Sequence, residues 1–374
     1  MYVLLIALIY ISKIVSNAIP RLSASKRKAW FIAVSFFFLF FLVAFRDSSV
    51  GTDIGNYLTK FTLIRNHSWG YVLTHFYTER VEIGFALLNK FLGLFTRQPQ
   101  TIIVASAALF CAGSARFIYR YLDNSLTAVI LFTCCGLYMY SFNITRQMIA
   151  VALLVNAWGL LTEKKYRLSL TLFAVSMLFH VMSFVFVLVY IFYTLRHNKR
   201  AVTITVSVGA FLVLLHRPLL HLASLLTDKF SYLDNTKQRI HAGGIWAVWG
   251  IELAIAALYI AYYFLKDKPV FERVQRRLPH SVSEISATTS LCIPLFSALY
   301  IVFSVMGTTF NNLDRFGVYF LPFCIPMFID FGKRLTEQNK TLGRIYLCGL
   351  HVCFVLYFVL FATTLDHYRY AFVW

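Results

Sequence analysis

Residues that can bind or transfer charged groups occur in this chain as six short polar patches between long apolar stretches. The patches are 46–57, Glu82, 143–147, His180, 217–241 and 311–315. Arginine guanidinium groups bind anionic oxygens through paired hydrogen bonds, and carboxylate or imidazole groups act as general bases. Ionisable groups in such apolar surroundings are costly and are therefore functional candidates. The patches predict a reaction site if the fold brings them to one place.

Each patch also has an ordinary structural explanation. Arg46 can end an apolar helix, Asp53 can cap one, and Glu82 can favour the N-terminus of the helix that follows it. Arg146 can belong to a loop cap, and a lone histidine such as His180 is more often a hydrogen-bonded core residue. The functional interpretation therefore depends on the convergence of the patches and not on any single residue.

The chain lacks the common signatures of nucleotide and metal chemistry. Asp-x-Asp, P-loop, Gly-x-Gly-x-x-Gly, His-x-x-x-His and Gly-x-Ser-x-Gly patterns are absent, and the seven cysteines form no Cys-x-x-Cys pair. We therefore predict no cofactor, no metal and no disulfide. A lipid-linked substrate that carries its own activated diphosphate leaving group fits fixed arginines and a general base.

The composition is that of a polytopic membrane protein. Hydrophobic residues make up 59% of the chain, charged residues make up 14%, and the mean hydropathy is +0.68. Soluble domains carry about 25% charged residues. Runs of roughly 17 to 25 apolar residues recur along the chain, which is the pattern of membrane-spanning helices. We therefore predict an all-α fold in which residues 1–374 form a single integral membrane domain.

The loops between the apolar stretches predict which side of the membrane each patch faces. The candidate spans are 2–19, 30–45, 100–119, 124–141, 147–162, 201–216, 245–265, 286–306, 316–332 and 345–362. Lys and Arg concentrate in the short loops 21–28, 116–120, 164–167, 196–200, 266–277 and 333–344. The positive-inside rule places these loops in the cytoplasm, and it accounts for the net charge of +19 without a nucleic-acid partner.

The polar patches and both termini then face the outside. The long outer loop 46–99 has apolar residues at helical spacing, which predicts short interfacial helices. The second outer loop is 217–244.

Residues 168–195 are the test of this topology. One helix of this length would be about 42 Å long and would cross the ~30 Å hydrocarbon core, so every later basic loop would lie outside. A hairpin with arms 168–179 and 181–195 keeps those loops in the cytoplasm. We therefore predict the hairpin, which gives about twelve membrane helices and places His180 in a recess open to the outer face.

Five of the patches resemble the EpsG-like family of Wzy-type polysaccharide polymerases in residue type and order. The matching segments are Arg46-Asp-Ser-Ser-Val-Gly-Thr-Asp53-x-x-x-Tyr57, Glu82-Ile-Gly-Phe85, Asn143-Ile-Thr-Arg146-Gln147-x-x-Ala150, Phe179-His180 and Asp314-Arg315-x-x-x-Tyr319. In the family, a small polar residue usually follows the histidine closely. In this chain Ser183 is the candidate for that position, although Met182 stands between it and the histidine. The stretch 217–244 matches no motif.

The resemblance implies a glycosyltransferase that polymerises undecaprenyl-diphosphate-linked oligosaccharide repeat units at the outer face of a bacterial inner (plasma) membrane. The products would be O-antigen, capsule or exopolysaccharide. Besides the lipid-linked substrate and membrane lipid, a chain-length regulator and a flippase are expected partners.

The resemblance also implies roles for the polar residues. Asp53, Glu82 and His180 are the candidates for the catalytic base. The candidates for substrate binding are Arg46, Tyr57, Asn143, Arg146, Gln147, Asp314, Arg315 and Tyr319. Arg146 and Arg315 would stabilise the leaving diphosphate, where negative charge develops, and Arg46 would support them.

Two other activities remain open from the sequence. A flippase or exporter of the same lipid-linked sugar would have cations along a central path and often repeated halves, whereas charged residues are scarce in the spans and no repeat is visible. A membrane acyltransferase with a cytoplasmic acyl donor would need its polar cluster on the basic side of the membrane.

Overall fold

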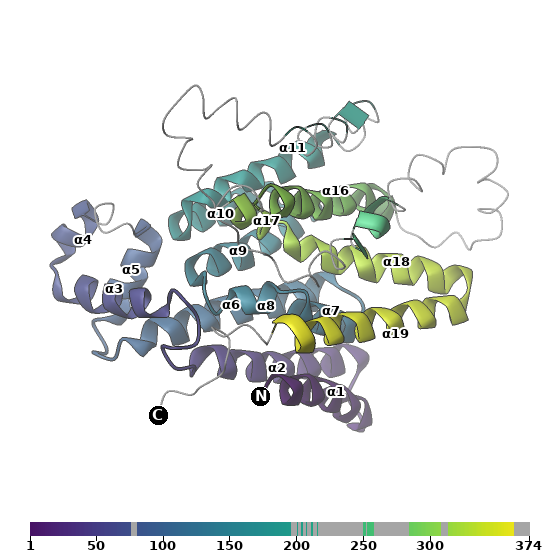
Figure 1. Ribbon diagram of the computed structural model, residues 1–374, viewed down its shortest axis with the longest axis horizontal. Coiled ribbons are helices and arrows are strands. Elements are labelled where there is room, and N and C mark those ends of the chain that lie inside the picture. The colour runs from purple at the N-terminus through teal and green to yellow at the C-terminus, as the bar shows by residue number, and fades with distance from the viewer. Residues whose placement is uncertain are drawn as a thin grey trace. The chain divides into compact units, whose positions relative to one another are not determined.

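The computed structural model describes most of the chain and divides it into two compact units. The described residues are 1–75, 81–195, 200, 203–204, 207, 211, 215, 250–251, 253–257, 284–307 and 313–362. The first unit comprises Met1–Phe184 and Gly349–Trp374, and the second comprises Val185–Cys348. Within the described residues every regular element is a helix and none is a strand (Figure 1). The predicted outer loop 217–244 lies outside the described residues, as do most of the predicted spans 201–216 and 245–265.

Among the residues that the structure describes, three helices are long and apolar enough to cross a membrane. They are α2 (Ala24–Ala44), α6 (Gln100–Tyr121) and the stretch Lys340–Leu360, which contains α19 (Lys340–Tyr357). Shorter apolar helices include α1 (Tyr2–Ala18) and α10 (Tyr166–Phe179). The all-helical, membrane-embedded character expected from the composition is confirmed. The total of about twelve spans and their orientation remain predictions.

The first unit is built around α9 (Thr145–Thr162), which packs between α6 and α10. The close approach of α6 and α9 depends on small residues, because a Cβ on Gly113 would lie 2.9 Å from the Cβ of Ala152. Asn156 fastens the same contact, since its Nδ2 donates to the Gly113 and Ala152 carbonyl oxygens at 2.8 Å each. At the other end of α6, Gln100 Nε2 donates to the Ala44 carbonyl oxygen at 2.8 Å and so ties α6 to the end of α2.

The predicted span 124–141 is interrupted in the structure. The helix α7 (Ser125–Cys134) ends about two turns before the predicted end of the span, and a short helix α8 (Leu137–Tyr140) follows it. Between them Gly136 has a φ of +97°, a backbone conformation that glycine adopts without steric cost. The expectation of one continuous helix was wrong because hydropathy alone cannot distinguish a broken apolar segment from an unbroken one.

The helix break predicted at His180 is present. The helix α10 ends at Phe179, and His180 is extended with φ −156° and ψ 108°. A 3-10 turn (Val181–Phe186) and α11 (Val187–Leu195) follow. The break is stabilised by the buried hydroxyls of Ser176 and Ser183, whose oxygens lie 3.0 Å apart. The helices α10 and α11 fall in different units, and the hairpin remains a prediction.

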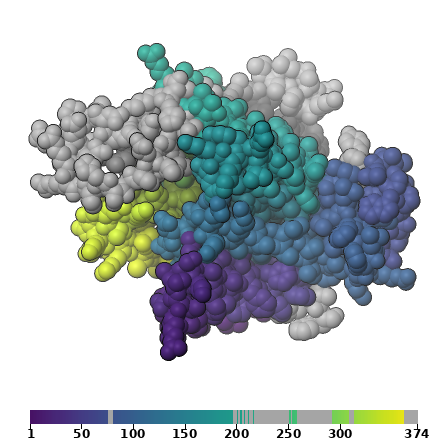
Figure 2. All heavy atoms as spheres, turned by 180° about the vertical axis from the view of Figure 1, so that it is seen from behind, coloured from purple at the N-terminus to yellow at the C-terminus, as the bar shows by residue number. Residues whose placement is uncertain are grey.

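The described part of the predicted outer loop 46–99 contains three short helices, α3 (Ile54–Asn66), α4 (Trp69–His75) and α5 (Ile83–Leu92). They gather at one end of the first unit (Figure 1), where they form the blue lobe of the space-filling view (Figure 2). Phe61 and Phe85 bury their rings beside Ile102 of α6. The Lys90 ammonium group donates to the carbonyl oxygens of Arg65, at 2.9 Å, and His67, and so caps the C-terminus of α3. The short helices expected here are present.

The second unit contains α16 (Glu284–Gly307), α17 (Leu313–Gly317) and α18 (Cys324–Gln338). Phe296 of α16 packs on Phe323 with ring centres 4.8 Å apart. Within the predicted span 316–332, the helix α18 begins only at Cys324. A 3-10 turn over Leu321–Phe323, with Pro322 inside it, precedes α18.

Candidate functional site

Several predicted patches meet at one end of the first unit. The turn that follows α2 lies against the loop that precedes α9. In this turn Gly51 has a φ of +107°, and a Cβ there would collide with the Phe142 carbonyl oxygen. Thr52 N donates to Asn143 Oδ1 at 2.7 Å. Two segments far apart in sequence are therefore held together by a glycine that allows contact and by an asparagine that caps the turn.

Arg46 is fully buried beneath this turn. Its guanidinium group donates to the carbonyl oxygens of Val43, Ser141 (3.3 Å) and Phe142 (3.4 Å), and it lies 5.0 Å from the centre of the Phe142 ring. A buried guanidinium that donates to three carbonyl groups orders the backbone around it. The sequence placed Arg46 among the substrate-binding residues; the structure places it inside the protein, where it joins the end of α2 to the loop before α9.

A small cavity lies beside Arg46. Its lining includes the hydroxyl-bearing residues Ser106, Ser141 and Thr145. The space open to the centre of a water molecule is about 10 Å³, roughly the room of one water. Sites for sugar-sized ligands have volumes of about 300 Å³ or more. This cavity is therefore much smaller than a site for a sugar.

Arg146 and Glu82 form an ion pair at the N-terminus of α9. Arg146 NH1 donates to Glu82 Oε2, and the two side chains are 23% and 18% exposed. The guanidinium carbon also lies 5.9 Å from the ring centres of both Tyr57 and Phe85. These two rings meet edge to face at 5.7 Å. The guanidinium is thus held by aromatic rings from α3 and α5 and by one carboxylate, and it remains in reach of solvent.

The position of Arg146 has an electrostatic consequence. It is the second residue of α9, and the N-cap residue Ile144 supplies no side-chain cap. A helix N-terminus carries partial positive charge and unsatisfied N–H groups, so a cation there is unfavourable for the helix alone. The helix end and Arg146 together attract an anion, and the Glu82 carboxylate is an anion that pairs with Arg146. Glu82 is the N-cap residue of α5, but its side chain makes no capping bond to that helix. The interpretation of Glu82 as only a helix-favouring acid therefore leaves out its pairing with Arg146.

Gly84 brings α5 against the end of α10 that carries His180. A Cβ on Gly84 would lie 2.7 Å from the Leu178 carbonyl oxygen and 2.9 Å from the Leu178 Cβ. Phe179 packs on the same apolar cluster as Tyr57 and Phe85. The Glu82 segment and the histidine segment, about a hundred residues apart in sequence, are therefore neighbours in the fold.

Replacing Gly84 with alanine is expected to push α5 away from α10. The new methyl group meets backbone atoms that cannot rotate aside, and such overpacking costs typically 1–3 kcal/mol. We expect a lower unfolding temperature in detergent and shorter glycan products. Gly70→Ala is the matched control, because the nearest atom to its Cβ would be Ser68 Oγ at 4.0 Å. Equal behaviour of the two variants would contradict the close contact.

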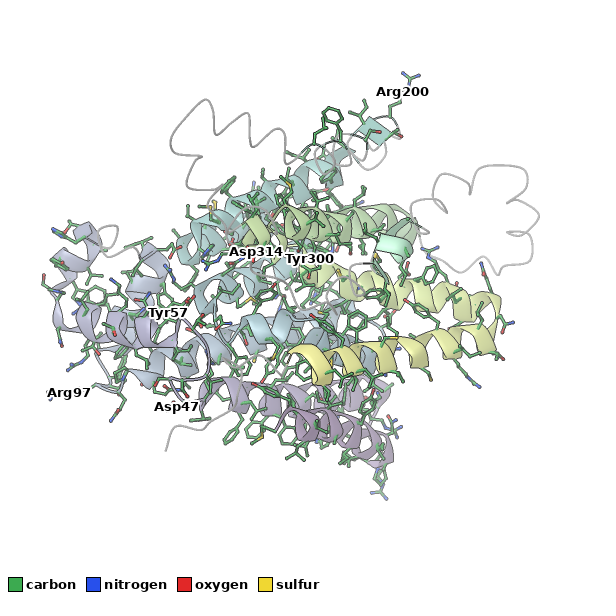
Figure 3. All side chains as sticks on the ribbon, in the orientation of Figure 1. Asp47, Tyr57, Arg97, Arg200, Tyr300 and Asp314 are labelled. Carbon is green, nitrogen blue, oxygen red and sulfur yellow. The ribbon has the colours of Figure 1, made fainter. Side chains whose placement is uncertain are left out.

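The remaining predicted residues of the first unit lie around the same region. Gln147 is almost fully buried, and Asn143 uses its Oδ1 to accept from Thr52. Asp53 is the partly exposed N-cap residue of α3, and its Oδ1 accepts from Thr52 Oγ1 at 3.4 Å. Tyr57, marked in Figure 3, is buried on the same helix. Asn143 and Asp53 thus use part of their hydrogen-bonding capacity to stabilise the turn at Thr52.

Asp314, Arg315 and Tyr319 belong to the second unit. The first two are on α17, and Asp314 packs so tightly on Gly307 that a Cβ there would lie 2.6 Å from the Asp314 Cβ (Asp314 is marked in Figure 3). Tyr319 is fully buried. The structure therefore groups the predicted site residues into a first-unit cluster and a second-unit segment.

Sequence reasoning missed the aromatic support of Arg146. Phe85 lies three residues after Glu82, and residues three apart share one face of a helix. The same spacing signal was available for Tyr57, which lies four residues after Asp53. Neither spacing predicts that the two rings converge on Arg146, because that convergence requires α3, α5 and α9 to pack together.

These features define a class: a helical membrane protein with an arginine–carboxylate ion pair whose arginine lies in the first turn of α9. A family model for the EpsG family matches residues 29–372, nearly the whole chain, and the chain belongs to this family. The EpsG family is a family of Wzy-like polysaccharide polymerases. No curated protein matches the chain. No solved structure matches it either. The resemblance drawn from the short motifs is confirmed.

Proposed function

We propose that this protein polymerises undecaprenyl-diphosphate-linked oligosaccharide repeat units at the outer face of a bacterial inner membrane. The observation that carries the proposal is the anion site at the N-terminus of α9, where Arg146 is held between two aromatic rings. A guanidinium group at a helix N-terminus suits a diphosphate. The family membership supplies the class of reaction, a glycosyl transfer that lengthens a polysaccharide.

In the proposed reaction a hydroxyl of the acceptor sugar attacks the anomeric carbon of the lipid-linked donor. A new carbon–oxygen bond forms, and the bond from that carbon to the diphosphate oxygen breaks. The diphosphate leaves with the electron pair, and Arg146 stabilises its developing charge. Arg315 of the second unit is a further candidate for this role. The hydroxyl proton passes to a general base, for which Asp53, Glu82 and His180 are the candidates.

Arg46 and Asn143 have positioning roles in this proposal. Arg46 orders the Ser141 and Phe142 carbonyl groups, and Asn143 holds the turn at Thr52. Both act on the segment that leads directly into α9. They therefore set the position of the first turn of α9, in which Arg146 is the second residue. Gln147 and Tyr319 are buried. Their proposed contact with sugar therefore requires the regions around them to open when substrate binds.

A reconstituted polymerisation assay tests the function. Purified protein in proteoliposomes is given undecaprenyl-diphosphate-linked repeat unit, and products are separated by size. We expect a ladder of glycans and release of undecaprenyl diphosphate in step with each added unit. Transport of the substrate across the bilayer without a ladder would support a flippase, and transfer of an acyl group to the sugar would support an acyltransferase; either result would overturn the proposal.

The outer-face location gives a separate prediction. Alkaline phosphatase folds only outside the cytoplasm, so a fusion after Asn66, on the predicted outer loop, is expected to be active. A fusion after Asn339, in a loop with several Lys and Arg residues, is expected to be inactive. The reverse pattern would put the Arg146 site on the cytoplasmic side and would contradict the proposed location.

A further inference from the structure

The ion pair between Arg146 and Glu82 occupies the position where the proposed function requires a diphosphate. We infer that Glu82 is a displaceable occupant of this anion site: the donor diphosphate takes its place on Arg146, and the released carboxylate then accepts the proton of the attacking hydroxyl. This inference rests on the proposed function and names Glu82 as the base among the three candidates.

The first support is the chemistry of the position. The N-terminus of α9 lacks a side-chain cap, and Arg146 adds a full positive charge one residue into the helix. Such a position binds an anion, and a carboxylate and a phosphate present the same kind of acceptor oxygen to it. The Glu82 carboxylate thus binds the guanidinium that a phosphate group would bind, and it has the same oxygen chemistry.

The second support is the way in which the guanidinium is held. Tyr57 and Phe85 lie near it at 5.9 Å each and belong to the buried core cluster of the lobe. These rings support the guanidinium independently of the carboxylate. Arg146 can therefore keep its place while the anion that it binds changes.

The third support is access. The side chains of Arg146 and Glu82 are both partly exposed, whereas Arg46 is fully buried with its carbonyl partners. A partly exposed pair exchanges partners more easily than a fully buried one, because water can reach it and replace the hydrogen bonds that are broken. A diphosphate carries more negative charge than a carboxylate and offers more acceptor oxygens, so it competes effectively for the guanidinium.

The proton balance follows from the exchange. While Glu82 Oε2 accepts from Arg146, that oxygen is engaged with a donor. After the diphosphate replaces it, the carboxylate remains beside the diphosphate at the N-terminus of α5 with an oxygen open to the acceptor hydroxyl. The carboxylate gains the proton that the hydroxyl loses, and the diphosphate leaves with the electron pair of the broken bond. The exchange thus places the released carboxylate beside the bound donor.

The test measures binding and turnover separately. Inorganic diphosphate is titrated into the full-length protein in nanodiscs, and the same variants are assayed for polymerisation. We expect Glu82→Gln to bind diphosphate roughly 10-fold more tightly than the wild type, because no carboxylate competes for Arg146. We expect its polymerisation to fall about 100-fold or more, because the base is lost. Tighter binding with slower turnover is a combination that a merely structural role of Glu82 does not produce.

Two further variants complete the test. Glu82→Ala provides a second test in case the new amide of Glu82→Gln disturbs the fold. This variant also lacks the carboxylate, so we expect the same gain in diphosphate affinity. Glu163→Gln removes the carboxylate of the Arg120–Glu163 pair (2.6 Å) and is expected to leave both readouts unchanged. This inference alone would be overturned if the wild type polymerises normally and both Glu82 variants bind diphosphate no more tightly than the wild type does. A wild type that makes no polymer would instead overturn the proposed function.

Discussion

Replacing Arg146 with alanine is expected to reduce polymerisation by about 100-fold or more, so that cells accumulate single repeat units in place of long glycan. Removal of one donor that stabilises developing negative charge typically costs a factor of 10² to 10³ in turnover. The loss is expected to be larger here than at most surface arginines, because the Arg146 guanidinium sits at a helix N-terminus and is held by Tyr57 and Phe85. Arg146→Lys is expected to restore only part of the activity, since an ammonium group lacks the planar fork.

The matched control is Arg120→Ala at the other end of the same helical unit. Arg120 also pairs with a glutamate, donating to both oxygens of Glu163 at 2.6 and 2.9 Å. These bonds and the bond from Lys165 lower the pKa of Glu163 to about 2, so the control removes a fully charged pair. Glycan length in this variant is expected to stay near the wild-type value. Near-normal glycan in both Arg146→Ala and His180→Ala would contradict the proposed site.

Replacing Gly51 with alanine is expected to abolish activity and to lower the stability of the first unit. The residue has a φ of +107°, and its added Cβ would collide with the Phe142 carbonyl oxygen, so both the backbone and its neighbour must move. A strained backbone conformation alone costs on the order of 1–3 kcal/mol. The turn would move away from Asn143, and the segment that positions Arg146 would lose its partner. The readouts are the unfolding temperature in detergent and the glycan length in cells.

Gly55→Ala is the control for this substitution. Gly55 lies on α3 four residues further on, and nothing lies within 4 Å of the position of its Cβ. Alanine is favoured over glycine within a helix by about 1 kcal/mol, so this variant is expected to be as stable as the wild type or slightly more so. If Gly51→Ala and Gly55→Ala lost activity and stability equally, the packing of the turn on the loop before α9 would not be the cause of the loss.

The inferred exchange would couple donor binding to the assembly of the site. Without the diphosphate, the Glu82 carboxylate accepts a hydrogen bond from Arg146. In the inferred exchange the same group then lies beside the leaving group and accepts the proton. Binding of the donor would thus complete the catalytic arrangement, as in induced fit.

Much of the architecture was predictable from local patterns. Apolar runs predicted the membrane helices, since a helix must cover its backbone polar groups in lipid. Helical spacing predicted short helices in the loop 46–99, and the basic residues on either side of 168–195 predicted a break near His180. The ordered polar motifs predicted the family, and a family model confirms it.

Other features could not be read from such patterns. The break at Gly136 lies inside an apolar run, and only its φ of +97° reveals it. The sequence named Arg46 as a candidate for substrate binding, but it could not show that the Arg46 guanidinium is buried on three carbonyl oxygens. A carbonyl group belongs to every residue, so no sequence pattern marks which carbonyls will surround an arginine.

The sequence by itself determined the class of the protein, its apolar helices, and which residues are able to bind an anion or accept a proton. These properties depend on side-chain type and on spacing along one segment. The tertiary structure alone decided that Glu82 pairs with Arg146, that Tyr57 and Phe85 hold the guanidinium, and that Gly84 admits the end of α10 beside α5. The physical reason is that each of these contacts joins helices distant in sequence, so it exists only after the lobe α3–α5 packs against α9 and α10.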